Sequence, residues 1–307
     1  MKNMSKKNKG LAKNGPLLLI ALPGIVYLLI NNYIPMFGVF LAFKKFNYSK
    51  GIFGSDWCGF DNFKYLFKQD AFLIVRNTIL YNLAFIILGT ILSIVVAILM
   101  CELGEKFRVK IFQSSLLLPN LLSWVVIGFI GFAFLNSDTG FINHTVIKLF
   151  GGKEIAWYTT PKYWPAILIL VYLWKNIGYS SIIYMASISG IDKSIFEAAK
   201  IDGATKLKQI RHITIPMLKP TVIILTLMSV GRIFYSDFGL FYQVPMNSGA
   251  LYNVTQTIDT YVYHGLMELN NVGMSAAAGL YQSVIGFVLV MLANTIVRKV
   301  DSDNALF

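Results

Sequence analysis

Polar and aromatic side chains recur at helical spacing inside three apolar stretches of this 307-residue chain. Residues that are three, four, seven or eight positions apart share one face of a helix. In 166–190 this face carries Tyr172, Lys175, Asn176, Tyr179 and Ser180. In 220–243 it carries Met228, Ser229, Arg232, Tyr235, Ser236 and Gly239. In 111–135 it carries Asn120, Ser123, Trp124, Ile127, Gly128 and Gly131.

These faces favour a water-filled path for a polar solute. Sugars suit such a lining, because their flat apolar ring faces stack on aromatic rings while their hydroxyls need donors and acceptors. A charge at mid-bilayer costs on the order of 3 kcal/mol, so Lys175 and Arg232 should face protein or water. The alternative is that the polar groups bind each other across neighbouring helices. The predicted pathway residues are Tyr172, Lys175, Asn176, Tyr179, Arg232, Tyr235, Ser236, Asn120 and Trp124.

Residues typical of catalytic or metal sites do not form a recognisable pattern. The three histidines, at 144, 212 and 264, lack ligand spacing. Cys58 and Cys101 fall on opposite sides of the predicted membrane and cannot pair. The sequence contains no HExxH motif, no Walker motif and no plausible Ser-His-Asp order. We therefore expect a protein that is not an enzyme and binds no metal or cofactor, so that any ATP is handled by another subunit.

The elements that position the polar faces are transmembrane helices. With 56% hydrophobic and 14% charged residues, the chain is too apolar for an ordinary soluble domain. About 20 apolar residues cross a bilayer as a helix. Pro23 and Pro35 should tilt or kink the first of the spans. We predict an all-α integral membrane protein, a single domain over 1–307, with six spans at 16–43, 77–103, 111–135, 166–190, 220–243 and 275–297.

The basic residues predict the orientation of the spans. Of the 27 Lys and Arg, sixteen fall in segments that are cytosolic if both termini are cytosolic, nine fall in the outside loops and two lie within spans. This bias follows the positive-inside rule and places the basic segment 1–15 in the cytosol. That segment is no cleaved signal peptide, because the apolar stretch after it is too long. The net charge of +12 reports orientation in the lipid bilayer and predicts no nucleic-acid partner.

The loop 191–219 between the fourth and fifth spans reads as two short helices joined at a bend. Asp192 or Ser194 can cap the first helix, and Ser194-x-x-Glu197 fits a capping box. Gly203 can end that helix in a left-handed conformation. Lys206 to His212 continues as a second helix, and Pro216 directs the chain toward the next span. The sequence therefore predicts a rigid, L-shaped cytosolic knob that a partner can grip.

This loop resembles the signature loop of binding-protein-dependent ABC importer permeases, which reads E-A-A-x-x-x-G, nine residues, then I-x-L-P. Ile215 replaces the usual leucine. In that family the loop is a coupling helix that docks into a groove on the ATPase subunit. The resemblance implies that the ATPase-coupling residues are Glu197, Ala198, Ala199, Asp202, Gly203, Ala204, Ile213 and Pro216.

Further segments resemble the LplB-like branch of the carbohydrate-uptake permeases, which is similar to the maltose importer's membrane subunits. They include Tyr33-Ile34-Pro35-Met36-Phe37-Gly38 and Asp237-Phe238-Gly239-Leu240-Phe241-Tyr242-Gln243-Val244-Pro245. The resemblance implies the type I, MetI-like architecture in a bacterial cytoplasmic membrane and import of oligosaccharides. It also implies a second, different permease subunit, two ATPase subunits that bind ATP and Mg, and an extracytoplasmic sugar-binding protein that meets the loop 244–274.

Three alternatives remain. The chain could be an importer permease for another class of polar solute. An ion-driven secondary transporter could use Lys175 and Arg232, but the spans show no acidic residue at mid-membrane to carry a proton or sodium ion, and the knob would be unexplained. A membrane enzyme should show clustered carboxylates, histidines or cysteines at an interface, and the sequence shows none.

Overall fold

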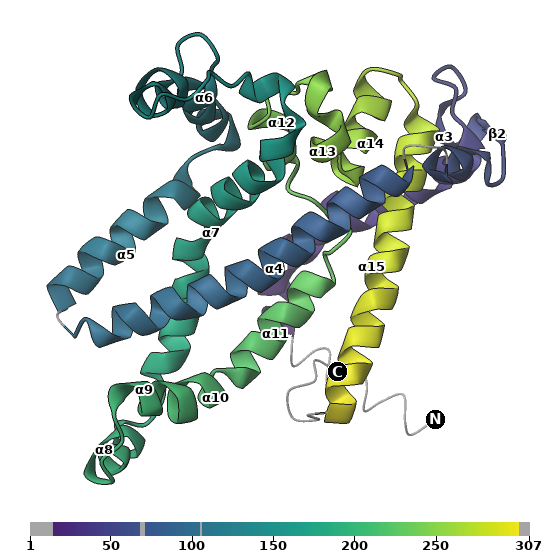
Figure 1. The fold of residues 1–307 in the computed structure, drawn as a ribbon. Helices are drawn as coiled ribbons and strands as arrows, with labels where there is room; N and C mark the ends of the chain where they lie inside the picture. Colours follow the sequence, from purple (N-terminus) through teal and green to yellow (C-terminus); the bar gives the residue numbers. More distant parts are fainter. Residues whose placement is uncertain (1–14, 68–70, 105, 301–307) are drawn as a thin grey trace, which may run out of the picture.

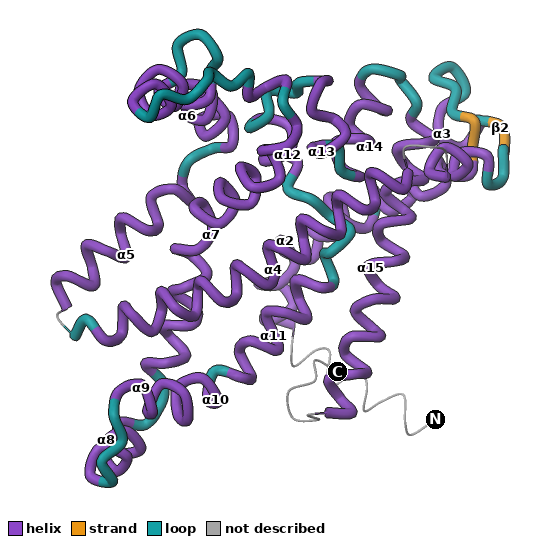
Figure 2. The backbone as a smooth tube through the Cα atoms, viewed as in Figure 1, coloured by secondary structure: helices purple, strands orange, loops and turns teal. Residues whose placement is uncertain are grey.

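The computed structural model describes residues 15–67, 71–104 and 106–300. Helices dominate these residues, beside one short antiparallel hairpin of β1 (Lys44–Lys45) and β2 (Asp56–Trp57) (Figure 1). The tube in Figure 2 shows the long helices running between two ends of the molecule. The all-α class predicted from the sequence is confirmed. Residues 1–14 and 301–307, where the cytosolic termini are predicted, lie outside the described residues.

Four helical segments among the described residues are long and apolar enough to cross a membrane, and two bent helix pairs bring the number to as many as six. The first segment joins α2 (Gly15–Leu28), the π-helix η1 (Leu29–Tyr33) and the 3₁₀-helix η2 (Pro35–Phe43). Pro35 offers no backbone N–H, and the helix changes its hydrogen-bond period on either side of it. The other three segments contain α4 (Ala71–Glu102), α7 (Trp164–Ser189) and α15 (Val272–Val300).

The third predicted span is not one straight helix. It consists of α5 (Lys106–Leu121) and α6 (Trp124–Leu135), which meet at an angle of 96°. Pro119 lies in the last turn of α5, and Ser123 is extended and caps α6 by accepting a hydrogen bond from the N–H of Val126. The prediction that 111–135 presents one continuous polar face is therefore wrong.

The fifth predicted span is also wrong in its boundaries. The helical run begins in the loop with α9 (Lys206–Gln209), the π-helix η7 (Ile210–Thr214) and α10 (Ile215–Met217), bends by 52° and continues as α11 (Lys219–Val230). Residues 231–237 are not helical, and α12 (Phe238–Gln243) follows them. Helical spacing within 220–243 is therefore lost after Val230.

Side chains from three other helices satisfy the backbone of this unwound stretch. The Asn82 amide of α4 donates to the carbonyls of Ile233 at 3.0 Å and Tyr235 at 2.9 Å. Gln282 of α15 donates to the carbonyl of Phe234 at 2.8 Å. Asp259 of α14 (Ile258–Met267) accepts from the N–H of Ser236. Irregular backbone at membrane depth requires such partners.

The predicted outside loops fold into a cap at the end opposite the knob (Figure 1). The cap packs on a core that contains Trp164, Leu168 and Leu251, each fully buried. The loop 244–274 is thus a folded part of the cap. Besides α12 and α14, the cap elements are α3 (Gly51–Gly54), η3 (Asp61–Phe67), η4 (Ile142–Ile147), η5 (Trp157–Thr159), η6 (Pro161–Tyr163), η8 (Gly249–Leu251) and α13 (Tyr252–Thr255).

Helix α7 packs between α4 and α5, and a glycine sets the closest approach. A Cβ atom at Gly178 would overlap the carbonyl oxygen of Leu116, so α5 and α7 meet backbone to backbone. Small residues at such crossings are the usual means of close packing between membrane helices. On the outer surfaces, large apolar side chains such as Ile20 and Leu121 remain about four-fifths exposed, as expected for surfaces that face lipid.

Candidate functional site

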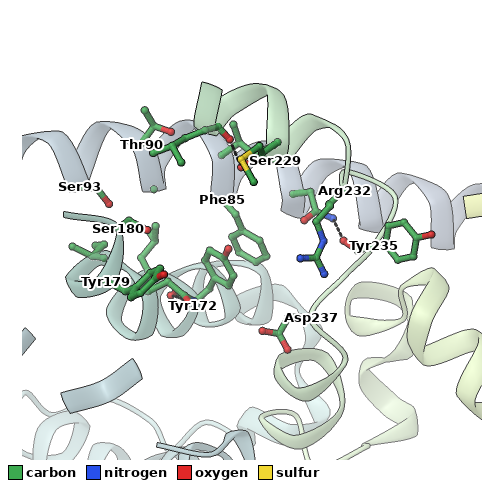
Figure 3. A pocket seen from close by; sticks show the side chains of 18 of the residues that line it. Phe85, Thr90, Ser93, Tyr172, Tyr179, Ser180, Ser229, Arg232, Tyr235 and Asp237 are labelled. Atoms are coloured by element: carbon green, nitrogen blue, oxygen red, sulfur yellow. Dashed lines mark hydrogen bonds between the residues drawn. The ribbon is translucent and has the colours of Figure 1, made fainter. Parts of the chain in front are cut away.

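A cavity of about 750 Å³ opens between α4, α7, α11 and the unwound stretch after α11 (Figure 3). Its lining mixes aromatic rings, hydroxyls, amides and two charged groups. The lining residues are Asn82, Phe85, Ile86, Gly89, Thr90, Ser93, Tyr172, Leu173, Asn176, Ile177, Tyr179, Ser180, Ile183, Tyr184, Leu225, Met228, Ser229, Arg232, Tyr235, Ser236, Asp237, Phe238 and Gly239.

On the α7 side, three of the predicted pathway residues line this cavity. The ring of Tyr172 stacks on Phe85 of α4 with centroids 3.7 Å apart, which extends the aromatic surface onto a second helix. Asn176 donates to the carbonyl of Tyr172 at 2.9 Å, and its carbonyl oxygen remains to accept. Tyr179 is 58% exposed. Helical spacing holds on this side because α7 is continuous.

On the opposite side, three more predicted residues line the cavity although they are not helical. Tyr235 shares a hydrogen bond with the hydroxyl of Ser283 at 2.9 Å. Ser236 donates to the carboxylate of Asp259 at 2.7 Å. Arg232 projects into the cavity (Figure 3). Neighbouring residues can line one cavity here because the chain is unwound, and not because of the helical spacing from which they were predicted.

The remaining three predicted residues do not line the cavity. The buried Lys175 ammonium donates to the backbone carbonyls of Pro119, Asn120 and Leu122, where α5 ends. It also lies 5.1 Å from the ring centroid of Trp124. Lys175 thus satisfies the carbonyls freed at the break between α5 and α6, which is the packing role that the alternative reading described.

Trp124 forms part of the cavity's supporting structure. Its indole N–H donates to the Asp237 carboxylate at 3.0 Å. A Cβ atom at Gly239 would overlap the indole ring, so this glycine lets α12 approach α6 closely. The α5–α6 break and the lower end of the cap are therefore linked through one tryptophan.

The knob contains the two predicted helical arms, and it extends beyond the membrane helices (Figure 1). Its first helix, α8 (Lys193–Ile201), is capped by Asp192, which accepts from the N–H of Ser194 at 2.9 Å. The predicted alternative of a Ser194 cap with Glu197 is wrong, because Ser194 already lies inside the helix. Gly203 has a φ of +76°, the left-handed conformation that was predicted.

After Gly203 the chain turns into α9, and Thr205 caps it by accepting from the N–H of Lys208. The second arm extends farther than predicted. It continues through Pro216 in α10 to Met217, where the 52° bend into α11 begins. Pro216 offers no backbone N–H, and the π-helix η7 lies directly before α10 in this run. The outer surface of the knob exposes Ile201 to 87% and Leu207 to 75%.

A comparison with known proteins identifies the family of a chain that carries this cavity and this knob. Residues 16–302 match the family described as "Binding-protein-dependent transport system inner membrane component". The chain belongs to this family. Its relatives include two Bacillus subtilis (strain 168) proteins. The polygalacturonan/rhamnogalacturonan transport system permease protein YteP is 32% identical over 94% of this chain and 89% of its own length. Protein LplB is 31% identical over 94% of this chain and 90% of its own length.

The fold matches solved structures as well. The crystal structure of a bacterial ABC transporter involved in the import of the acidic polysaccharide alginate contains a chain with a TM-score of 0.87. The two chains are 28% identical, and the match covers 96% of this chain and 99% of the other. Family membership makes this chain a multi-pass transport subunit of the cytoplasmic membrane and not an enzyme. The resemblance drawn from the sequence is confirmed.

Asp237 and Phe85 are among the cavity residues that were missed from the sequence. Asp237 faces the cavity (Figure 3) and lies just beyond the unwound stretch. An acidic residue in the apolar stretch 220–243 is the signal that points to it. Phe85 carried no signal, because an apolar residue in the apolar span 77–103 is indistinguishable from its lipid-facing neighbours.

The Asp192 cap gives a testable prediction for the first arm of the knob. The Ser194 backbone N–H, and then its hydroxyl, donate to the carboxylate and hold the pKa of Asp192 below its usual range. A lowered pKa stabilises the folded arm above the usual carboxyl pKa of about 4, and this contribution is lost as the pH falls through the lowered value. Asp192→Ala should therefore speed amide hydrogen exchange in 193–201 severalfold at neutral pH. Asp192→Asn, which also caps, should retain most of the protection; unchanged exchange in the alanine variant would contradict the assignment.

Proposed function

We propose that this chain is one of two transmembrane permease subunits of an ATP-driven importer of oligosaccharides, and that its cavity forms half of the translocation pathway. One observation carries the proposal. The cavity walls are continuous with the knob, since α7 leads directly into α8 and the second arm continues into α11. A displacement of the knob by a partner therefore moves two walls of the cavity.

The lining and the relatives both support a sugar as the substrate. The stacked pair of Phe85 and Tyr172 and the exposed ring of Tyr179 offer apolar faces next to hydroxyls and amides. Relatives that match most of the chain include proteins named for polygalacturonan and rhamnogalacturonan, for arabinooligosaccharides and for starch degradation products. An importer of oligosaccharides explains this combination better than an importer of another class of polar solute.

The same proposal assigns the partners. Two ATPase subunits bind the nucleotide, and one of them receives the knob, whose exposed Ile201 and Leu207 supply an apolar contact. A second, different permease subunit supplies the other half of the path. An extracytoplasmic sugar-binding protein meets the loop 244–274 of the cap. A bacterial alginate ABC transporter, similar to this chain, was solved in complex with an alginate pentasaccharide-bound periplasmic protein. An ion-driven carrier would leave the knob without a role.

Truncation of Tyr179 tests the pathway. Tyr179→Ala should lower uptake of the transported oligosaccharide about tenfold, because about 60 Å² of apolar contact with a sugar ring is worth roughly 1.5 kcal/mol at about 25 cal/mol per Å². Assembly with the partner subunits should be unchanged, since no buried charge is exposed. Trp174→Ala is the matched control, because Trp174 is an exposed aromatic residue on α7 that does not line the cavity. Equal uptake by both variants would contradict the proposal.

Single cysteines along 172–183 and 228–239, in a background without Cys58 and Cys101, map the same pathway with a small water-soluble thiol reagent. On α7 the labelled positions should follow the cavity lining at helical spacing, and the transported glycan should slow their labelling. In 228–239 labelling should persist without helical spacing after Val230, because the chain is unwound there. An absence of labelling on both sides would show that water does not reach these residues and that the cavity is no translocation pathway.

A further inference from the structure

The cavity contains one positive charge that the chain itself does not compensate. Arg232 is exposed, and its side chain projects into the cavity (Figure 3). Within residues 15–67, 71–104 and 106–300, no side-chain hydrogen bond or ion pair to its guanidinium is found. A guanidinium at membrane depth is costly unless water or an anion accompanies it. The position of Arg232 therefore indicates that its guanidinium can bind an anionic group in the cavity.

The other charges near the cavity are already engaged. Asp237 is the only acidic residue among the described lining residues, and its carboxylate accepts from the indole of Trp124 and caps α12 through the N–H of Leu240. The Lys175 ammonium, held by three carbonyls, lies over the ring of the same indole, 5.1 Å from its centroid. Lys175 and Asp237 thus carry opposite charges, and both contact Trp124. Their charges cancel, so Arg232 sets the net charge at the cavity.

We propose that Arg232 makes this cavity selective for saccharides that carry a carboxylate, as uronic acids do. The inference rests on the proposed function and adds the substrate class. A guanidinium holds a carboxylate through two parallel hydrogen bonds between opposite charges, and sugar hydroxyls carry no charge to match this pairing. The aromatic surface of Phe85 and Tyr172 is available to the ring of the same sugar, since both side chains line the cavity with Arg232. A neutral sugar can accept hydrogen bonds from the guanidinium through its hydroxyls but leaves the positive charge uncompensated, so it should bind less well.

The charge of the cavity is measured with a single cysteine at Ser229, one helical turn before Arg232, in the complete importer reconstituted in lipid. Two thiol reagents of similar size are compared, the negatively charged sulfonatoethyl and the positively charged trimethylammonioethyl methanethiosulfonate. Arg232→Gln should lower the ratio of anionic to cationic labelling rates about tenfold, as expected for one unit charge within several ångströms at intermediate dielectric. Arg232→Lys should preserve the ratio. Arg76→Gln is the control for net charge, because Arg76 bonds Asn77 and Asn253 outside the cavity.

Protection of the same cysteine tests the ligand class. Trigalacturonate should slow labelling at a concentration about tenfold lower than its fully methyl-esterified form, and Arg232→Gln should remove this difference. Equal protection by the acid and the ester in the unaltered chain would overturn the carboxylate preference while leaving the pathway intact. An absence of protection by either saccharide, together with an unchanged rate ratio in Arg232→Gln, would overturn both the preference and the pathway.

Discussion

Gly203→Val is expected to lower both uptake and substrate-stimulated ATP hydrolysis about tenfold, because a β-branched residue pays roughly 1–2 kcal/mol or more in the left-handed conformation. The φ of +76° is the cause, since a Cβ at this position meets no atom within 4 Å. The variant therefore changes the angle between α8 and α9 without a clash. The two activities fall together, because the bend fixes how the knob sits against its partner.

A matched substitution separates the backbone effect from the loss of a glycine. Gly190 precedes the knob with a φ of −81°, and a Cβ there makes only ordinary contacts, so Gly190→Ala should transport normally. Gly203→Asn should retain most activity, because asparagine tolerates the left-handed region. Normal uptake and ATP hydrolysis by Gly203→Val would show that the bend does not position the knob.

Gly178→Ala should prevent stable assembly of the membrane subunit. The added methyl group would overlap the carbonyl oxygen of Leu116, and a backbone atom cannot move aside as a side chain can. Forcing α5 and α7 apart should cost roughly 3 kcal/mol, the upper part of the range for overpacked cores. The yield of assembled importer and its thermal unfolding midpoint in detergent are the measurements.

Gly89→Ala is the control for Gly178→Ala. Gly89 lies in the adjacent α4, and its Cβ would make an ordinary contact of 3.9 Å with Leu173. Alanine is preferred over glycine within a helix by about 1 kcal/mol, so Gly89→Ala should be neutral or stabilising. Equal yields of the two variants would contradict the backbone contact between α5 and α7.

The sequence predicts most of the fold because its strongest signals are local. Apolar stretches of sufficient length identify the spans, and the order of cap, helix and glycine predicts the knob around Gly203. Helical spacing finds the cavity wall on α7 for the same reason, since the helix is unbroken from Trp164 to Ser189. The family is identified from the knob alone, and the later comparison agrees with it.

The parts of the fold that could not be predicted depend on contacts between residues far apart in the chain, which helical spacing does not reveal. Pro119 marks a weak point in α5, but the carbonyls freed at the 96° bend are bonded by Lys175, which reaches them from another helix. The same lysine was assigned to the pathway, because its polarity is visible in the sequence and its partners are not. Unwinding after Val230 likewise needs acceptors and donors from α4, α14 and α15, which lie far away in the chain.

These distant partners also impose an order on biogenesis. Asn82 enters the membrane with α4, and its amide reaches the carbonyl of Ile233 only after 151 further residues have been made. Until then, its partner is the carbonyl of Thr78 in its own helix. The first half of the chain therefore cannot complete its packing during synthesis. A chain that ends before Ile233 leaves the Asn82 amide without the two acceptors that it has in the complete fold.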